Sequence, residues 1–238
     1  MERTFQYRWL EQGRLIILLA FLNLGCMAVR AQDDPQYRME IGAGVGVMTY
    51  EGDFNGNVFS DMQPAGFLVG RYIFDPYKDL KLSVGFGKIK GSSANVDTFY
   101  PDYAENPYFF NSTLVDMNLV FEYNFWPYGT GRDYRGAQRL VPYILGGLGA
   151  TYVKGNEKNV FTANVPLGIG AKYKVNERLN LGLAWTFHFS LSDELDGVKD
   201  PYWVKSSGIF KNTDCYSTIA VSVTYSFSAK CKTCNKEE

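Results

Sequence analysis

The single histidine of the chain lies beside residue types that could support catalysis. His188 is followed by Ser190 and by the acidic residues Asp193, Glu194 and Asp196. A serine, a base and an acid are the parts of a hydrolase, so a lipid-modifying enzyme that uses His188 is one hypothesis. Residues two apart on a strand are separated by about 6.6 Å along its axis, which is long for a hydrogen bond between nucleophile and base. We therefore expect no catalytic residue and a histidine that is satisfied inside the fold.

The same acidic residues offer oxygen ligands of the kind that calcium prefers. Their spacing is not that of a known calcium loop, so a solvated loop is the simpler interpretation. We expect no metal site, no cofactor and no small-molecule substrate.

Composition excludes several classes of protein. Of 238 residues, 46% are hydrophobic and 16% are aromatic, which is too apolar for a disordered chain. The formal net charge is −1, so nothing electrostatic points to nucleic acid.

The N-terminus has the pattern of a secretory signal peptide. Residues 1–31 combine an arginine-containing start, an apolar run from Leu15 to Leu24 and small residues that end at Ala31. Leu24-Gly25-Cys26 also resembles the end of a lipoprotein cleavage site, which is the alternative. No later stretch is apolar enough for a spanning helix, so an exported chain of this kind is either soluble or a closed barrel.

The rest of the chain alternates apolar and polar residues with the period of two that is typical of strands. We predict eight strands and no helix, with the barrel over residues 32–227: Tyr37–Val47, Ala65–Phe74, Leu80–Ile89, Thr113–Phe125, Val141–Val153, Val165–Tyr173, Leu179–Ser190 and Cys215–Phe227. An even number of strands of this length, with connections that alternate between short and long, indicates an all-β, eight-stranded antiparallel up-and-down transmembrane barrel of the size of OmpA.

The two faces of the predicted strands differ in a way that favours a membrane. One face is apolar and ends in aromatic residues, as in interfacial girdles, whereas a soluble barrel of the lipocalin type buries its apolar face. A two-sheet sandwich is the alternative for the same pattern. We expect the charged residues of the other face to pair inside the barrel: Arg38, Glu40, Lys81, Asp116, Glu122 and Lys172.

The C-terminal segment, residues 228–238, is predicted to be a periplasmic tail because both termini of such a barrel are periplasmic. It carries Lys230, Cys231, Lys232 and Cys234. A local Cys231–Cys234 disulfide bond is one interpretation; a bond to another protein is the other, since the processed chain has an odd number of cysteines. Cys215 begins the last strand, roughly 40 Å from the tail, and is out of reach.

The connection over residues 126–140 is long for a periplasmic turn and is basic, with Arg132, Arg135 and Arg139. Together with the tail it predicts a positive periplasmic rim. This rim is either a solvated surface or a docking surface for an acidic periplasmic partner.

The sequence also resembles a known family, the PorG-type outer-membrane barrels of the type IX (Por) secretion system. The ordered motifs that carry the resemblance are Met39-Glu40-Ile41-Gly42, Tyr50-Glu51-Gly52-Asp53, Gly70-Arg71-Tyr72, Gly87-Lys88-Ile89-Lys90-Gly91, Val165-Pro166-Leu167-Gly168-Ile169-Gly170, Asp193-Glu194-Leu195-Asp196-Gly197 and Val223-Thr224-Tyr225-Ser226-Phe227. The resemblance implies a non-enzymatic outer-membrane component of a protein-export machine. It further implies, as partners, a periplasmic ring lipoprotein (PorK-like) and its ring subunit (PorN-like). A free-standing OmpA-type barrel, for membrane stability or adhesion through its outer loops, is the alternative.

Overall fold

The computed structural model describes residues 37–51, 55, 59–93, 109–129, 137–155, 159–192, 195 and 214–229. The predicted signal peptide and residues 230–238 of the predicted tail lie outside these residues and stay predictions, whereas Ser228 and Ala229 belong to the last strand. In the described part, no helix is long and apolar enough to cross a membrane.

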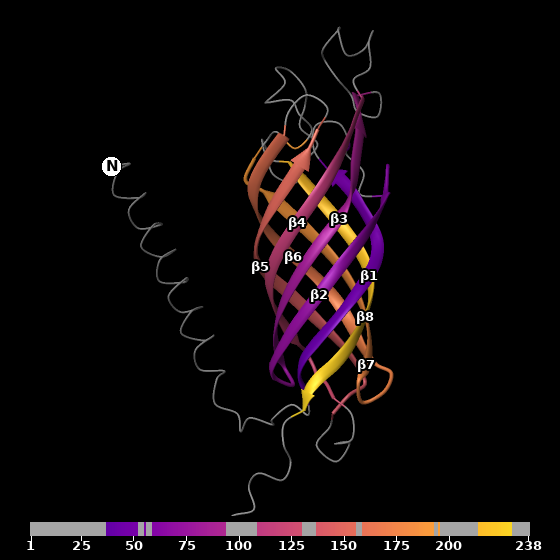
Figure 1. Cartoon of the computed structure of the whole chain (residues 1–238), viewed down its shortest axis with the longest axis vertical. Helices are drawn as coiled ribbons and strands as arrows, with labels where there is room; N and C mark the ends of the chain where they lie inside the picture. The colour runs from indigo at the N-terminus through magenta and orange to yellow at the C-terminus, as the bar shows by residue number, and fades with distance from the viewer. Residues whose placement is uncertain are drawn as a thin grey trace, which may run out of the picture. The chain divides into compact units, whose positions relative to one another are not determined.

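Eight antiparallel strands form a closed barrel in which each strand pairs with its neighbours in sequence and β8 pairs with β1 (Figure 1). The predicted fold class is therefore confirmed. The strands are β1 (Tyr37–Glu51), β2 (Gln63–Asp75), β3 (Lys78–Ser92), β4 (Phe109–Asn124), β5 (Leu140–Lys154), β6 (Asn159–Lys174), β7 (Leu179–Ser190) and β8 (Cys215–Ala229).

The largest difference from the predicted strand boundaries is at β6. This strand begins at Asn159 rather than Val165, because its register with β5 continues as far as the pair Lys154–Asn159. Val160, Thr162 and Asn164 keep the alternation and point inward. The β5–β6 connection is consequently even shorter than the sequence indicated, and spans residues 155–158.

The two ends of the barrel differ in their connections. At the turn end, where β1 begins and β8 ends, the connections are residues 76–77, 125–139 and 175–178. At the loop end they are residues 52–62, 93–108, 155–158 and 191–214. Three of the four loop-end connections are long, as predicted, and the strands between the two ends are 12 to 16 residues long.

The outer wall of the barrel is apolar, and the inside holds buried charged side chains. Buried positions include Glu40, Arg71, Asp79, Glu122 and Lys172. The exposed side chains of the middle of the wall are aliphatic: Ile41, Val45, Leu68, Leu82, Met117, Leu119, Ile144, Leu148, Leu167, Ile169, Leu181, Leu183, Val221 and Val223. This is the inverse of a soluble barrel and the arrangement of a barrel whose outer wall contacts lipid.

Aromatic side chains border this apolar band at both ends. Towards the turn end they are Tyr72, Phe74, Phe121, Phe125, Trp126, Tyr173, Tyr225 and Phe227, and towards the loop end Phe59, Phe86, Phe109, Tyr152 and Phe161. Rings at the two membrane–water interfaces are typical of transmembrane barrels. Tyr37, at the turn end of β1, is buried, and the guanidinium of Arg178 lies 5.7 Å from the centre of its ring.

The seam between β1 and β8 depends on inward-facing glycines. A Cβ atom at Gly42 would overlap the Val223 carbonyl oxygen, and one at Gly46 would overlap the Ile219 carbonyl oxygen. Because these clashes are with backbone, a side chain could not be accommodated by rotation alone. Glycine at these two positions therefore allows the first and last strands to close the barrel.

The outer wall yields the first prediction. Replacing Leu119 of β4, in the middle of the apolar band, with arginine is expected to destabilise the barrel folded in lipid by about 2–4 kcal/mol, because the charge falls near the bilayer midplane. Replacing Leu140 at the turn end of β5 with arginine is the matched control, with an expected cost of about 0–1 kcal/mol. Urea titration in vesicles measures both, and equal costs would contradict a lipid-facing band.

Candidate functional site

Glu122 is the centre of a charge network in the half of the interior that lies towards the turn end. Its carboxylate contacts Arg71 Nε at 2.9 Å, Lys81 Nζ at 2.7 Å and Lys172 Nζ at 2.6 Å. Arg71 also pairs with Glu40, and Lys172 also pairs with Asp79. The network thus balances three cations with three carboxylates, all of them buried.

Neutral side chains add hydrogen bonds to two carboxylates of the network. Asn180 Nδ2 donates to Glu40 at 3.0 Å, and Thr224 Oγ1 donates to the same carboxylate at 3.1 Å. Asn124 Nδ2 donates to Asp79 at 3.0 Å, while its oxygen accepts from Lys172 at 3.1 Å. Since uncompensated buried charge is costly, these contacts explain how six ionised groups share one interior.

Strand register explains why the members depend on each other. Glu40 lies opposite Arg71, but Arg71 lies opposite Lys81, and Asp79 lies opposite Glu122. Like charges directly opposite on neighbouring strands are destabilising. Diagonal pairing to Glu122 compensates for this, so its loss affects both cations at once.

Tyr128 covers the network at the turn end. The Lys174 ammonium lies 5.0 Å from the centre of its ring and the Lys172 ammonium 5.7 Å, within reach of a cation–π contact. Tyr128 lies in the β4–β5 connection, outside the strands, and burial raises the pKa of its hydroxyl well above the ordinary value. The phenol therefore stays neutral at physiological pH.

A small cavity lies next to the network, in the middle of the barrel. It has a volume of about 50 Å³ and is lined by Arg71, Lys81, Asp116, Asn118 and His188 among others. That volume fits roughly three to five waters, whereas drug-sized ligands occupy about 300–1,000 Å³. The cavity is therefore suited to solvent and not to a substrate.

His188 lies beside this cavity and stacks on Tyr216, with ring centres 4.4 Å apart and an interplanar angle of 4°. Its Nε2 is 3.3 Å from Thr218 Oγ1, and its Nδ1 is 3.8 Å from Asp116. The Ser190 hydroxyl instead accepts a hydrogen bond from the Ser192 amide. The structure thus pairs His188 with Thr218 and Asp116 and not with the serine of the hydrolase hypothesis.

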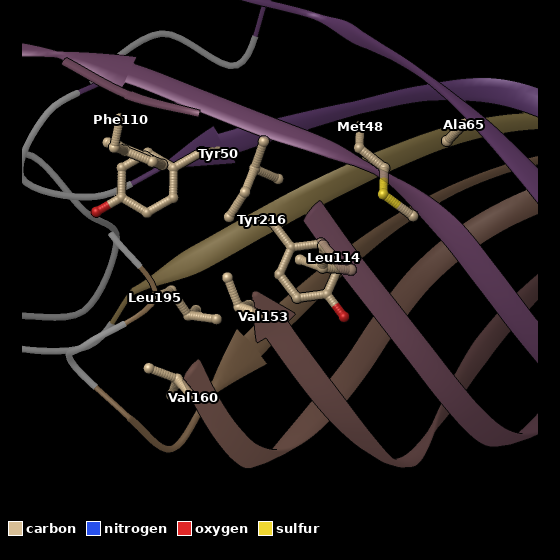
Figure 2. Close-up of a cluster of buried hydrophobic side chains, with 10 residues drawn as sticks. Met48, Tyr50, Ala65, Phe110, Leu114, Val153, Val160, Leu195 and Tyr216 are labelled. Atoms are coloured by element: carbon tan, nitrogen blue, oxygen red, sulfur yellow. The ribbon is translucent and has the colours of Figure 1, made fainter. Parts of the chain in front are cut away.

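The half of the interior towards the loop end is filled by apolar side chains (Figure 2). They come from seven strands and from the β7–β8 connection: Met48, Tyr50, Ala65, Ile89, Phe110, Leu114, Val153, Val160, Leu195 and Tyr216. Tyr50 donates to Asp214 at 2.5 Å, and the Leu195 amide donates to the other oxygen of Asp214 at 2.8 Å. This cluster closes the barrel at the loop end, as the charge network does towards the turn end.

The structure brings together most of the residues that were expected to pair inside. Glu40, Lys81, Glu122 and Lys172 belong to the charge network. Asp116 is buried but accepts a hydrogen bond from the Tyr216 hydroxyl at 3.0 Å. It therefore contacts the apolar cluster and not the charge network. Arg38 is half-buried at the start of β1, two residues before Glu40.

Of the predicted contact residues on the periplasmic rim, only Arg139 lies in the described part of the chain. It is exposed, just before β5, and its carbonyl accepts a hydrogen bond from the Lys174 amide. Arg132, Arg135, Lys230, Cys231, Lys232 and Cys234 lie outside the described residues, as do Asp193, Glu194 and Asp196. Within the described part, no group of three His, Cys, Asp or Glu side chains could hold a metal ion.

Arg71 and Asp79 are network residues that the sequence interpretation missed. Arg71 lies on β2, where Phe67, Val69 and Ile73 also face inward, so polarity did not reveal the buried face. The tight turn between β2 and β3 gives no reliable signal either. An unbroken ladder from the pair Asp75–Lys78 would place Arg71 opposite Leu82, whereas a register shift between Ile73 and Asp75 places it opposite Lys81.

The closed barrel, apolar outside and charged inside, has the fold of an outer-membrane β-barrel. A model of the family described as a domain of unknown function (DUF6089) matches residues 15–236. The chain belongs to that family. No curated protein matches it at a significant level.

Solved structures with low identity resemble the chain. Neisserial surface protein A (NspA) is 12% identical, with 79% of this chain and 97% of that one covered and a TM-score of 0.45. The outer membrane protein OprG from Pseudomonas aeruginosa is 13% identical, with 82% and 100% covered and a TM-score of 0.46. Ail of Yersinia pestis is 10% identical, with 80% and 99% covered and a TM-score of 0.43.

The charge network yields the second prediction. Replacing Glu122 with glutamine keeps its shape but leaves three buried cations with two carboxylates. We expect the free energy of unfolding to fall by about 3–5 kcal/mol, measured by denaturant titration in detergent. Glu177→Gln, in the exposed turn before β7, is the control and should change stability by no more than about 0.5 kcal/mol. Equal effects would show that the network does not hold the barrel.

The closed interior yields the third prediction. In a planar bilayer the purified protein should give no stepwise ion current, because the apolar cluster and the charge network both occupy the lumen. A porin inserted at the same protein-to-lipid ratio is the positive control. A stable current from the unmodified protein, at voltages that leave it folded, would contradict a sealed barrel.

Proposed function

We propose that this protein is a non-enzymatic outer-membrane component of a type IX protein secretion apparatus, of the PorG type. In this proposal it spans the outer membrane with both termini in the periplasm. It anchors or organises a periplasmic ring formed by a PorK-like lipoprotein and a PorN-like subunit. The contacts are made by the periplasmic connections and the tail.

The observation that carries the proposal is the closed interior. Because the lumen holds a charge network, a small cavity and an apolar cluster, transport through it and chemistry on a bound substrate are both disfavoured. The function of the protein then depends on the surfaces at the two ends of the barrel. The turn end combines exposed Arg139 with Arg132, Arg135 and the lysine-bearing tail, which gives a positive surface suited to an acidic partner. The sequence motifs supply the type IX assignment.

Affinity purification tests the proposal and provides the fourth prediction. The tagged full-length protein is recovered from detergent-solubilised outer membrane, with and without reductant, and co-purifying proteins are identified by mass. We expect a periplasmic ring lipoprotein to be recovered with the wild type. We expect at least a fivefold loss with the triple variant R132Q, R135Q, R139Q and with deletion of residues 230–238.

The matched control removes three positive charges from the other end of the barrel. The variant K88Q, K90Q, K154Q should recover the lipoprotein as the wild type does. If a band that collapses on reduction also disappears in C231S, C234S, the tail forms an intermolecular disulfide bond. Recovery of the barrel alone, in every lane, would overturn the secretion role.

A free-standing barrel of the OmpA type is the second candidate. Leu195, from the β7–β8 connection, is 1% exposed and is tied to Asp214 within the apolar cluster. This contact holds part of a long connection at the loop end and favours an ordered outer surface of the kind an adhesin presents. Wild-type barrel recovered without partners, together with normal secretion in a deletion strain, would support this candidate.

A further inference from the structure

Three lysines stand on the outer wall of the barrel at the loop end. Lys88 and Lys90 are on β3, where Ile89 between them is buried inside, so both lysines face outward. Lys154 ends β5 and shares the outward face with Tyr152. We refer to Lys88, Lys90 and Lys154 as the lysine rim.

Strand register groups these lysines closely. Lys88 lies opposite Thr113 of β4, and Thr113 lies opposite Lys154. Lys88 and Lys154 are therefore two strand spacings apart, about 10 Å, and Lys90 is about 7 Å further along β3. Two outward-facing asparagines flank the lysines: Asn111 of β4 lies opposite Lys90, and Asn159 of β6 lies opposite Lys154. The rim is thus a continuous polar patch across four strands.

The rim lies where the apolar band ends. Lys78, at the turn end of β3, also faces outward and is ten positions from Lys88. That separation is about 33 Å along the strand, or about 25 Å along the barrel axis at ordinary strand tilt. The apolar band of a transmembrane barrel is about 25 Å tall. Lys78 and Lys88 therefore mark its two boundaries, and Lys90 and Lys154 lie beyond it.

Among the residues that the structure describes, no carboxylate pairs with the lysine rim. Lys78 has Asp75 at 3.6 Å, and Lys81 and Lys172 in the interior have carboxylates, but no ion pair or hydrogen bond of the described residues involves a rim lysine. Below the rim, towards the middle of the band, Phe86, Tyr152 and Phe161 are exposed. Positive charge above exposed rings is a surface for a lipid with an anionic headgroup.

The opposite side of the loop end is different. Thr49 and Glu51 of β1 and Ser217 of β8 also point outward by alternation, yet all three are buried. The ring of Phe59, from the β1–β2 connection, lies 6.2 Å from Trp185 of β7. The protein's own chain therefore covers this wall, and lipid access at the loop end is concentrated on β3 to β6.

We propose that the lysine rim binds the phosphate groups of lipid A, the phosphorylated glycolipid of the outer leaflet, while the acyl chains pack on Phe86, Tyr152 and Phe161. Lysine ammonium groups recognise phosphate as point charges, and rings at this depth contact the start of the acyl chains. This site goes beyond the proposed secretion role. It requires only that the loop end faces the outer leaflet.

The test is equilibrium binding of purified full-length protein in nanodiscs to fluorescent bisphosphorylated lipid A, the fifth prediction. A lysine near a charged membrane surface contributes roughly a fivefold factor in affinity, so K88Q, K90Q, K154Q should raise the Kd about a hundredfold. The charge-conserving variant K88R, K90R, K154R should bind within about threefold of the wild type. The turn-end variant K78Q should not change the Kd. Circular dichroism and heat-modifiable migration confirm that each variant is folded.

Two further probes identify the lipid. Dephosphorylated lipid A should bind no more tightly to the wild type than to the glutamine variant, since the contact is made to phosphate. Phosphatidylglycerol should bind more weakly than lipid A. An unchanged Kd in the glutamine variant, or equal affinity for phosphatidylglycerol through the same lysines, would overturn the proposal. Because the assay uses no secretion partner, its outcome does not depend on the proposed function.

Discussion

The carboxylate of Glu122 joins β4 to cations from β2, β3 and β6, and the closed interior depends on that interaction. A soluble barrel gains stability by burying apolar side chains in its lumen. Here the apolar surface faces outward, so much of the lumen must be filled by polar groups that satisfy one another. Charges taken out of water are tolerated only where partners and hydrogen bonds compensate them. Balanced charge, rather than hydrophobic burial, therefore sets which side chains the turn-end half can hold.

This constraint divides the lumen into two halves of different chemistry. The charge network needs a full set of partners, whereas the apolar cluster around Tyr216 needs only complementary shape. Tyr216 lies at the inner border of the apolar cluster, where its hydroxyl bonds to Thr151 and Asp116. The small cavity with His188 lies between the halves. A histidine held there by stacking and by Thr218 belongs to the packing of the lumen, which is why a lone histidine was a poor indicator of catalysis.

Alternation predicted most of the fold because a wall between lipid and a polar lumen enforces it on every strand. It was clearest on β4 and β7 and failed on β2, where apolar residues face both ways and Arg71 was overlooked. On β5 the sequence could not show which way the glycine-rich strand faces; its register with β4 places Tyr143 and Leu145 inside. Ion pairs such as Glu122 with Arg71 form between strands that are not adjacent in sequence. The alternation pattern within a single strand therefore cannot predict them. The tail cysteines and most of the basic connection lie outside the described residues, so that part of the site rests on sequence.

A sealed lumen places function at the two ends, and the ends are built differently. At the turn end, Arg178 bonds to Tyr37 and Tyr225 and so joins the first strand to the last. That contact closes the seam where the chain leaves the barrel. A tail leaving from a fixed seam has a defined starting point, which suits attachment to a periplasmic assembly.

At the loop end, the rim lysines and exposed rings lie on β3 to β6, away from the covered wall of β1 and β8. Lipid contact on one sector would fix the rotation of the barrel about its axis, and with it the direction in which the turn end presents Arg139. Once the barrel is solubilised in detergent, that orientation is lost, and the two ends make their contacts through different residues.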